Sequence, residues 1–110
     1  MKSLEEGMSL RIFIGETDRY KGKALYEQIV FKAKELKLSG VTVVRGLMGF
    51  GADSRMHTSK ILSLSDNSPI IIEIVDSKEN LDRLLPFLDE ALLEGMVTLE
   101  KVKVTKYRHN

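Results

Sequence analysis

The residues best suited to chemistry lie in a long polar stretch between two predicted strands, residues 49–69. It opens with Gly49-Phe50-Gly51, and small residues allow a backbone to approach a ligand closely and to aim amide donors at an anion. The same residues also suit a turn with positive φ, so the motif alone leaves both interpretations open. Arg55 and His57 add positive charge to the stretch, either as ligand contacts or as solvated loop residues.

Charged residues elsewhere form a second group of candidates. Arg45 interrupts the apolar pattern of a predicted buried strand. An unpaired buried charge is costly, so we expect Arg45 to meet either the carboxylate of Glu73 or a phosphate. Glu16, in a charged loop after the first predicted strand, is either a ligand or subunit contact or part of a solvated turn. Lys101 and Lys103 are either a solvated strand end or contacts that face a phosphate.

Several classes of chemistry are excluded by composition. The chain has no cysteine, hence no disulfide, zinc ribbon or thiol nucleophile. Its two histidines, His57 and His109, lie far apart and make no metal site, and no nucleophile–base or paired-carboxylate arrangement predicts a catalytic centre. Seventeen basic against sixteen acidic residues give a net charge of +1, too balanced for charge-driven nucleic-acid binding. The apolar runs are too short for a membrane span or signal-peptide core, so we expect a cytoplasmic protein.

The first half of the chain contains three predicted elements. Residues 1–7 are polar and acidic, and we expect them to form a flexible leader. Apolar residues alternate over 9–14, as in a strand, and then recur at helical spacing over 24–40, ending at a glycine. Residues 41–48 are β-branched and apolar at both parities, which predicts a buried strand.

The second half repeats this order. Residues 70–75 are almost wholly apolar and predict a third strand. Asp76 and Glu79 have the spacing of a capping box before a helical stripe over 81–92, in which Pro86 predicts a kink. The last strand covers 97–105, and its apolar parity changes half-way, which predicts a bulge near Lys101.

Strand, helix, strand, strand, helix, strand is the order of an α+β, ferredoxin-like βαββαβ sandwich. This fold has a four-stranded antiparallel sheet with both helices on one face. The 110 residues form a single domain with a long loop, 49–69, between the second and third strands. Both parities of these two strands are apolar, although two helices can cover only one face of a sheet. We therefore expect a second copy of the chain to cover the other face.

The chain resembles the PII-type nitrogen-regulatory signalling proteins, and above all an uncharacterised PII-like subgroup of that superfamily. The resemblance covers residues 8–107 and depends on the joint order of short motifs, each of which is unspecific. Its motifs are Gly15-Glu16, Arg45-Gly46, Gly49-Phe50-Gly51, His57-Thr58, and Gly95-Met96-Val97-Thr98.

The resemblance implies a homotrimer whose sheets face inward, with an adenine-nucleotide site in each cleft between subunits. Transferred to this sequence, the nucleotide-binding residues are those at the start of the long loop and those at the turn before the last strand: Gly49, Phe50, Gly51, Gly95, Met96 and Val97. It also implies basic contacts from the last strand and a non-enzymatic regulator that signals to a protein target, such as a membrane transporter, through the loop.

Two departures from the PII pattern modify this expectation. The turn before the last strand is Glu94-Gly95-Met96, without the lysine that holds terminal phosphates, which favours AMP or ADP over ATP. The 49–69 loop lacks the tyrosine that is modified in PII.

Two alternative functions belong to folds with the same order of strands and helices. An RRM-like RNA-binding module would need aromatic residues on its central strands. A hydrolase of the acylphosphatase type would need an asparagine beside its phosphate loop.

Overall fold

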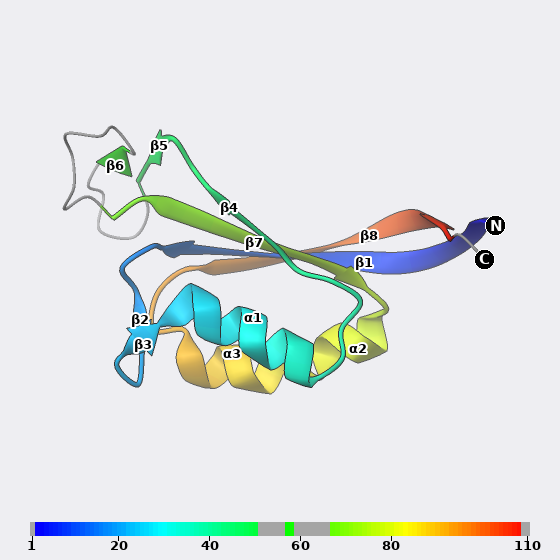
Figure 1. Ribbon diagram of the computed structural model, residues 1–110, viewed down its shortest axis with the longest axis horizontal. Coiled ribbons are helices and arrows are strands. Elements are labelled where there is room, and N and C mark those ends of the chain that lie inside the picture. Colours follow the sequence, from blue (N-terminus) through cyan, green and yellow to red (C-terminus); the bar gives the residue numbers. More distant parts are fainter. Residues whose placement is uncertain (1, 51–56, 59–66, 109–110) are drawn as a thin grey trace.

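The computed structural model describes residues 2–50, 57–58 and 67–108. Its main feature is a four-stranded antiparallel sheet with the order β4-β7-β1-β8, covered on one face by helices (Figure 1). This is the predicted ferredoxin-like α+β fold. The elements are β1 (Lys2–Gly15), β2 (Arg19–Tyr20), β3 (Lys23–Ala24), α1 (Leu25–Glu35), β4 (Thr42–Arg45), β5 (Met48–Gly49), β6 (His57–Thr58), β7 (Pro69–Asp76), α2 (Lys78–Asp82), α3 (Leu85–Ala91) and β8 (Met96–Tyr107).

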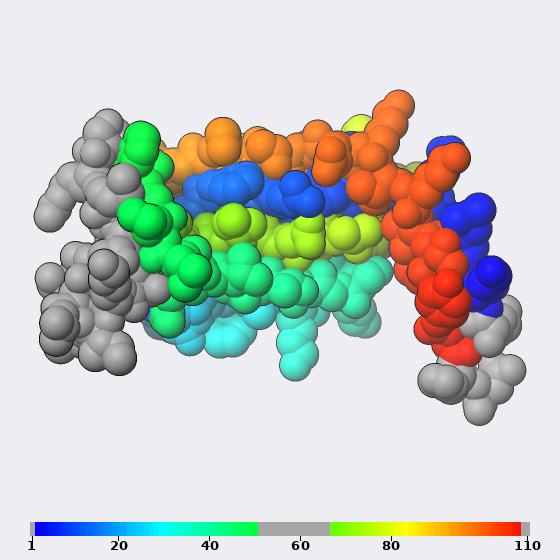
Figure 2. Space-filling model, turned by 90° about the horizontal axis from the view of Figure 1, so that it is seen from above, coloured from blue at the N-terminus to red at the C-terminus, as the bar shows by residue number. Residues whose placement is uncertain are grey.

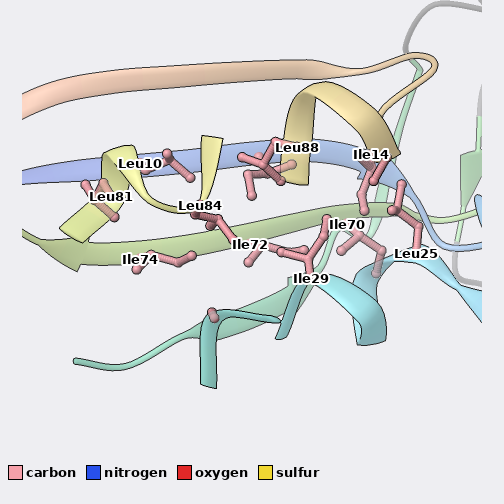
Figure 3. Packing of buried hydrophobic residues seen from close by; sticks show 13 residues of the cluster. Leu10, Ile14, Leu25, Ile29, Ile70, Ile72, Ile74, Leu81, Leu84 and Leu88 are labelled. Atoms are coloured by element: carbon pink, nitrogen blue, oxygen red, sulfur yellow. The ribbon is translucent and has the colours of Figure 1, made fainter. Parts of the chain in front are cut away.

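The core lies between the sheet and the helices, where the predicted periodicities meet (Figure 3). Alternate residues of β1 and β7 point toward the helices, because side chains along a strand alternate between its faces. The helices pack against the sheet through apolar side chains that are spaced three or four residues apart. The buried set is Leu10, Ile12, Ile14, Leu25, Ile29, Ala33, Ile70, Ile72, Ile74, Leu81, Leu84, Leu88 and Ala91.

The second helical stretch is broken into α2 and α3, with Pro86 in the first turn of α3. A proline has no backbone donor and is tolerated there, so the expected kink is present as a break.

The expected capping box is displaced by one residue, because Ser77 is the cap and its Oγ accepts from Asn80 N at 3.2 Å. Asp76 instead accepts hydrogen bonds from Ser39 N, Ser77 N and Asn80 Nδ2. Partial burial raises the pKa of Asp76, but these bonds outweigh it and hold the pKa below its ordinary value.

The N-terminal residues are not a flexible leader, because residues 2–7 belong to β1 and pair with residues 102–107 of β8. We call this paired extension the arm, and Figure 1 shows it projecting beyond the helices. The sequence pattern did not predict a strand in the arm because its side chains are mostly polar, whereas strand pairing requires only backbone groups. The bulge expected near Lys101 is also absent. Pairing runs without interruption from Lys2 opposite Tyr107 to Phe13 opposite Met96.

The sheet face opposite the helices is open in this single chain, and Figure 2 shows β8, β1, β7 and β4 side by side across it. β4 is an edge strand, with Val44 47% exposed, rather than the buried strand that its composition predicts. Glu73 lies on this open face and pairs with Arg11 (Nε–Oε2, 2.8 Å), not with Arg45. The hydrogen bond to Glu73 raises the pKa of Arg11.

A short β2–β3 hairpin precedes α1 and turns through Lys21 and Gly22, both at positive φ. Tyr20 fixes the hairpin to α3. Its ring lies edge-on to Phe87 with centroids 5.4 Å apart, and its hydroxyl donates to Glu90. The hydrogen bond to Glu90 raises the pKa of Tyr20.

Candidate functional site: a cleft at the end of the sheet

A cleft of about 460 Å³ lies at the end of the sheet opposite the arm. It is formed where β1 ends, β7 and β8 begin and the β4–β5 connection passes over them. Apolar side chains supply most of its walls, from Phe13, Ile14, Met48, Phe50, Pro69, Ile70, Ile71 and Met96. Its volume and composition are those of small-molecule pockets, which typically measure ~300–1,000 Å³ and are mainly apolar.

The cleft unites the two segments that the sequence singled out. Gly49 and Phe50 from the start of the long loop line it together with Gly95 and Met96 from the turn before β8. Their role in binding a nucleotide remains a prediction. Val97 is placed differently, since it packs against the core on the helix side of the sheet.

None of the remaining candidates is among the described residues of the cleft wall. Gly51 and Arg55 are outside the described residues, and His57 pairs with Gly49 in the β5–β6 ribbon. On β8, Lys101 lies opposite Met8 next to the arm and Lys103 lies opposite Glu6 within the arm, and neither is part of the described cleft wall.

Arg45 and Glu16, which the sequence analysis considered separately, form an ion pair with each other. The side chain of Glu16 is 26% exposed and that of Arg45 is 56% exposed. The pair joins the end of β1 to the end of β4, beside Gly46 in the cleft wall. Of the two partners considered for Arg45, Glu73 is therefore replaced by Glu16, a carboxylate from a loop near the cleft, whereas contact of Arg45 with a phosphate remains a prediction.

Close backbone packing shapes the cleft at two glycines. A Cβ on Gly46 would lie 2.8 Å from Pro69 Cγ, and the amide of Gly46 donates to Pro69 O at 2.7 Å. Gly95 has φ of 120°, and a Cβ there would lie 2.7 Å from Phe13 O. Each glycine thus lets two backbone segments approach more closely than a side chain would allow.

The polar edge of the cleft is formed by residues that the sequence analysis did not select. Asp18 lines it, and its Oδ2 accepts from Gly15 N at 2.9 Å. Asn67 lines it as well, and its Oδ1 accepts from Thr17 N at 2.7 Å. The spacing of Gly15 and Asp18 is that of a side-chain-capped turn, which is the one signal that could have identified Asp18.

The charge of the described cleft wall is negative. Asp18 and Glu94 are its ionisable members, and none of its described residues is a lysine or arginine. The described part of the chain also holds no group of three or more His, Asp or Glu side chains placed to bind a metal ion. None of its helices is both long and apolar enough to cross a bilayer. With its apolar walls and its polar edge, the cleft suits a largely apolar ligand that presents hydrogen-bonding groups along one edge.

Comparison with known families confirms the resemblance read from the motifs. The sequence profile of the DUF190 family, described as "Uncharacterized ACR, COG1993", matches residues 7–104. The chain belongs to this family. A UPF0166 protein of Aquifex aeolicus is 35% identical over 95 residues, covering 86% of this chain and 90% of that protein. A UPF0166 protein of Methanocaldococcus jannaschii is 36% identical over 98 residues, covering 88% and 90%.

Solved structures show that the DUF190 chain has a PII-like fold. CPII, a nitrogen regulatory PII-like protein from Thiomonas intermedia K12, matches with a TM-score of 0.66 and 21% identity over 93% of this chain and 91% of that one. That CPII structure holds ADP, AMP and bicarbonate. A putative PII-like signaling protein from Thermus thermophilus gives a TM-score of 0.61 at 22% identity, over 94% and 92%. GlnK of B. subtilis, in complex with ATP, gives 0.58 at 13% identity, over 88% and 82%.

Proposed function

We propose that this DUF190 protein is a PII-like regulator that binds an adenine nucleotide, AMP or ADP in preference to ATP, in the cleft at the end of its sheet. One observation carries the proposal: the start of the long loop and the turn before β8 are far apart in sequence but line one apolar cleft of about 460 Å³. The fold is shared with CPII, whose structure holds ADP and AMP. A ligand there would touch Phe50, at the start of the 49–69 loop, and so influence that loop.

The nucleotide phosphates need cations that the described cleft wall does not contain. The arm and the adjoining part of β8 carry them at the other end of the molecule, where Lys2, Lys106 and Arg108 line a small hollow and Lys101 and Lys103 precede it. Within one chain these two ends lie apart, so in this proposal a neighbouring copy adds their charges to the cleft. This supports a homotrimer with inter-subunit sites. The open sheet face, with Phe13, Val44 and Ile71 on adjacent strands, is the surface for the copies to share.

The cleft offers binding groups without a catalytic arrangement. Its described carboxylates have no nucleophile or general base beside them in a recognised geometry, so we propose a non-enzymatic regulator. We propose the cytoplasm as its compartment, as the sequence analysis expects. Its output is the 49–69 loop, which would contact a protein target such as a membrane transporter when the nucleotide state changes. Glu94 and Asp18 add negative charge to the cleft and disfavour the additional phosphate of ATP.

Calorimetry and thermal melting with AMP, ADP, ATP and GMP test the proposal. A ligand at 100 times its Kd adds about 2.7 kcal/mol to stability, so we expect AMP or ADP to raise the melting temperature clearly. Phe50→Ala should weaken AMP binding about five- to tenfold, because an aromatic wall is lost from the cleft. Phe31→Ala is the matched control, since Phe31 is 58% exposed on α1, close to the 66% of Phe50, but lies outside the cleft wall.

Light scattering on the same samples gives the assembly state, expected at three times the chain mass of 12.4 kDa. Melting curves that stay unchanged with every adenine nucleotide at millimolar concentration refute the sensor. A stable single-chain species refutes the inter-subunit site.

A further inference from the structure

The carboxamide of Asn67 is held in one orientation at the polar edge of the cleft. Thr17 N donates to its Oδ1 at 2.7 Å, and an amide whose oxygen is engaged by a backbone N–H must present its nitrogen elsewhere. Among the residues that the structure describes, none accepts a hydrogen bond from Nδ2. Asn67 lines the cleft, so this nitrogen is a donor available to a ligand.

Two neighbours of Asn67, Ser68 and Gly15, keep this donor in place. The next residue, Ser68, is 4% exposed, and its carbonyl accepts from Glu16 N at 2.8 Å. Gly15 packs against the carboxamide so closely that a Cβ there would overlap the Asn67 side chain. The donor is thus preorganised before any ligand arrives, and preorganised polar groups give a site its specificity.

Asp18 provides an acceptor on the same edge. Its Oδ2 accepts from Gly15 N at 2.9 Å, which leaves Oδ1 to accept from a ligand. A carboxylate repels phosphate, so the Asp18–Asn67 edge faces the base of a nucleotide and not its phosphates. Adenine has an amino donor beside a ring-nitrogen acceptor, whereas hypoxanthine has a carbonyl acceptor beside a ring N–H donor.

We propose that Asn67 and Asp18 select adenine by its edge: Asn67 Nδ2 donates to a ring nitrogen, and Asp18 Oδ1 accepts from the exocyclic amino group. The assignment rests on the proposed function of the cleft as a nucleotide site. It makes these two residues the determinants of base specificity, and the wild type then binds AMP more tightly than IMP. A single hydrogen-bond reversal at a site of this kind typically changes discrimination by about tenfold or more.

Isothermal titration of AMP and IMP into the full chain tests the assignment through the ratio of their Kd values. In Asn67→Asp, one carboxylate oxygen still accepts from Thr17 N, so the local fold is kept. The other oxygen repels the adenine ring nitrogen but accepts from the ring N–H of IMP. We expect the IMP/AMP ratio of Kd values to fall at least about tenfold. Asp18→Asn should lower it in the same direction, because its new amide nitrogen donates to the IMP carbonyl.

Gln28→Glu on α1 is the control, since it adds the same charge as Asn67→Asp but lies outside the cleft wall. It should leave the ratio unchanged. Purely structural damage in the two cleft variants would weaken both nucleotides equally, so an unaltered ratio in both variants overturns the assignment. An equal shift in the control overturns it as well. Failure of the wild type to bind any adenine nucleotide is a separate result: it refutes the proposed function, and the base assignment falls with it.

Discussion

Replacing Gly95 with alanine is expected to lower the free energy of unfolding by about 3 kcal/mol, the sum of two separate penalties. The first is conformational, because Gly95 has φ of 120°, where a side chain costs about 1–2 kcal/mol. The second is steric. The new methyl group would lie 2.7 Å from Phe13 O and 3.2 Å from Ile14 Cγ2. Phe13 O belongs to the backbone of β1, one of the two inner strands, so relief requires the sheet itself to shift.

Two other glycines separate these penalties. Gly22 has φ of 78° but nothing within 4 Å of a Cβ position, so Gly22→Ala should cost only the conformational part, about 1 kcal/mol. Gly40 has neither a positive φ nor a neighbour within 4 Å, so Gly40→Ala should be neutral or stabilise by up to about 1 kcal/mol.

Urea and thermal unfolding at one fixed protein concentration measure the series, because the stability of an oligomer depends on concentration. At about 4 °C per kcal/mol for a domain of this size, Gly95→Ala should melt about 12 °C below the wild type. A Gly95→Ala variant no less stable than Gly22→Ala would refute the reasoning, since it would mean that the strand end yields freely.

Two further predictions concern charged groups. Because the pKa of Asp76 is lower in the folded state than its ordinary 3.8, ionised Asp76 stabilises the fold above that pH, and the contribution is lost as the pH falls through the lowered value. Unfolding followed from pH 5 to pH 2 should therefore show a shallower loss of stability in Asp76→Asn than in the wild type, and parallel curves would contradict this. For the Arg45–Glu16 pair, whose side chains are 56% and 26% exposed, a double-mutant cycle with Arg45→Gln and Glu16→Gln should give a coupling energy below about 1 kcal/mol that decreases with added salt. A coupling above about 2 kcal/mol would show that the pair is desolvated, as in a closed cleft.

The layered fold could be predicted because its core follows local periodicity. Leu10, Ile12 and Ile14 alternate along β1, and Leu81, Leu84 and Leu88 recur at helical spacing, so the buried faces are visible in the sequence. The two segments at the cleft were identified through motif resemblance, and Gly49, Phe50, Gly95 and Met96 do line it.

What could not be predicted depends on contacts between distant parts of the chain. Strand order decides that β4 lies at an edge, and local composition carries no information on order. Val97 and Leu99 lie on the helix side of the sheet, whereas Val102 and Val104 lie on the opposite face, where β8 extends beyond the helices. The parity change therefore marks the point where β8 leaves the helical layer, not a bulge. Asn67 has no motif around it, and its position in the cleft follows from the hydrogen bond that it accepts from Thr17 N, fifty residues earlier.

The strand order also has a consequence for synthesis on the ribosome. β1 is made first, yet it lies between β7 and β8, the last two strands of the sheet to be made. For most of translation its backbone donors and acceptors lack their final neighbours, and the pairing with β8 closes the largest sequence separations in the molecule. A nascent chain that stalls before Met96 leaves one edge of β1 unpaired over its whole length, and an unpaired strand edge invites association with other chains.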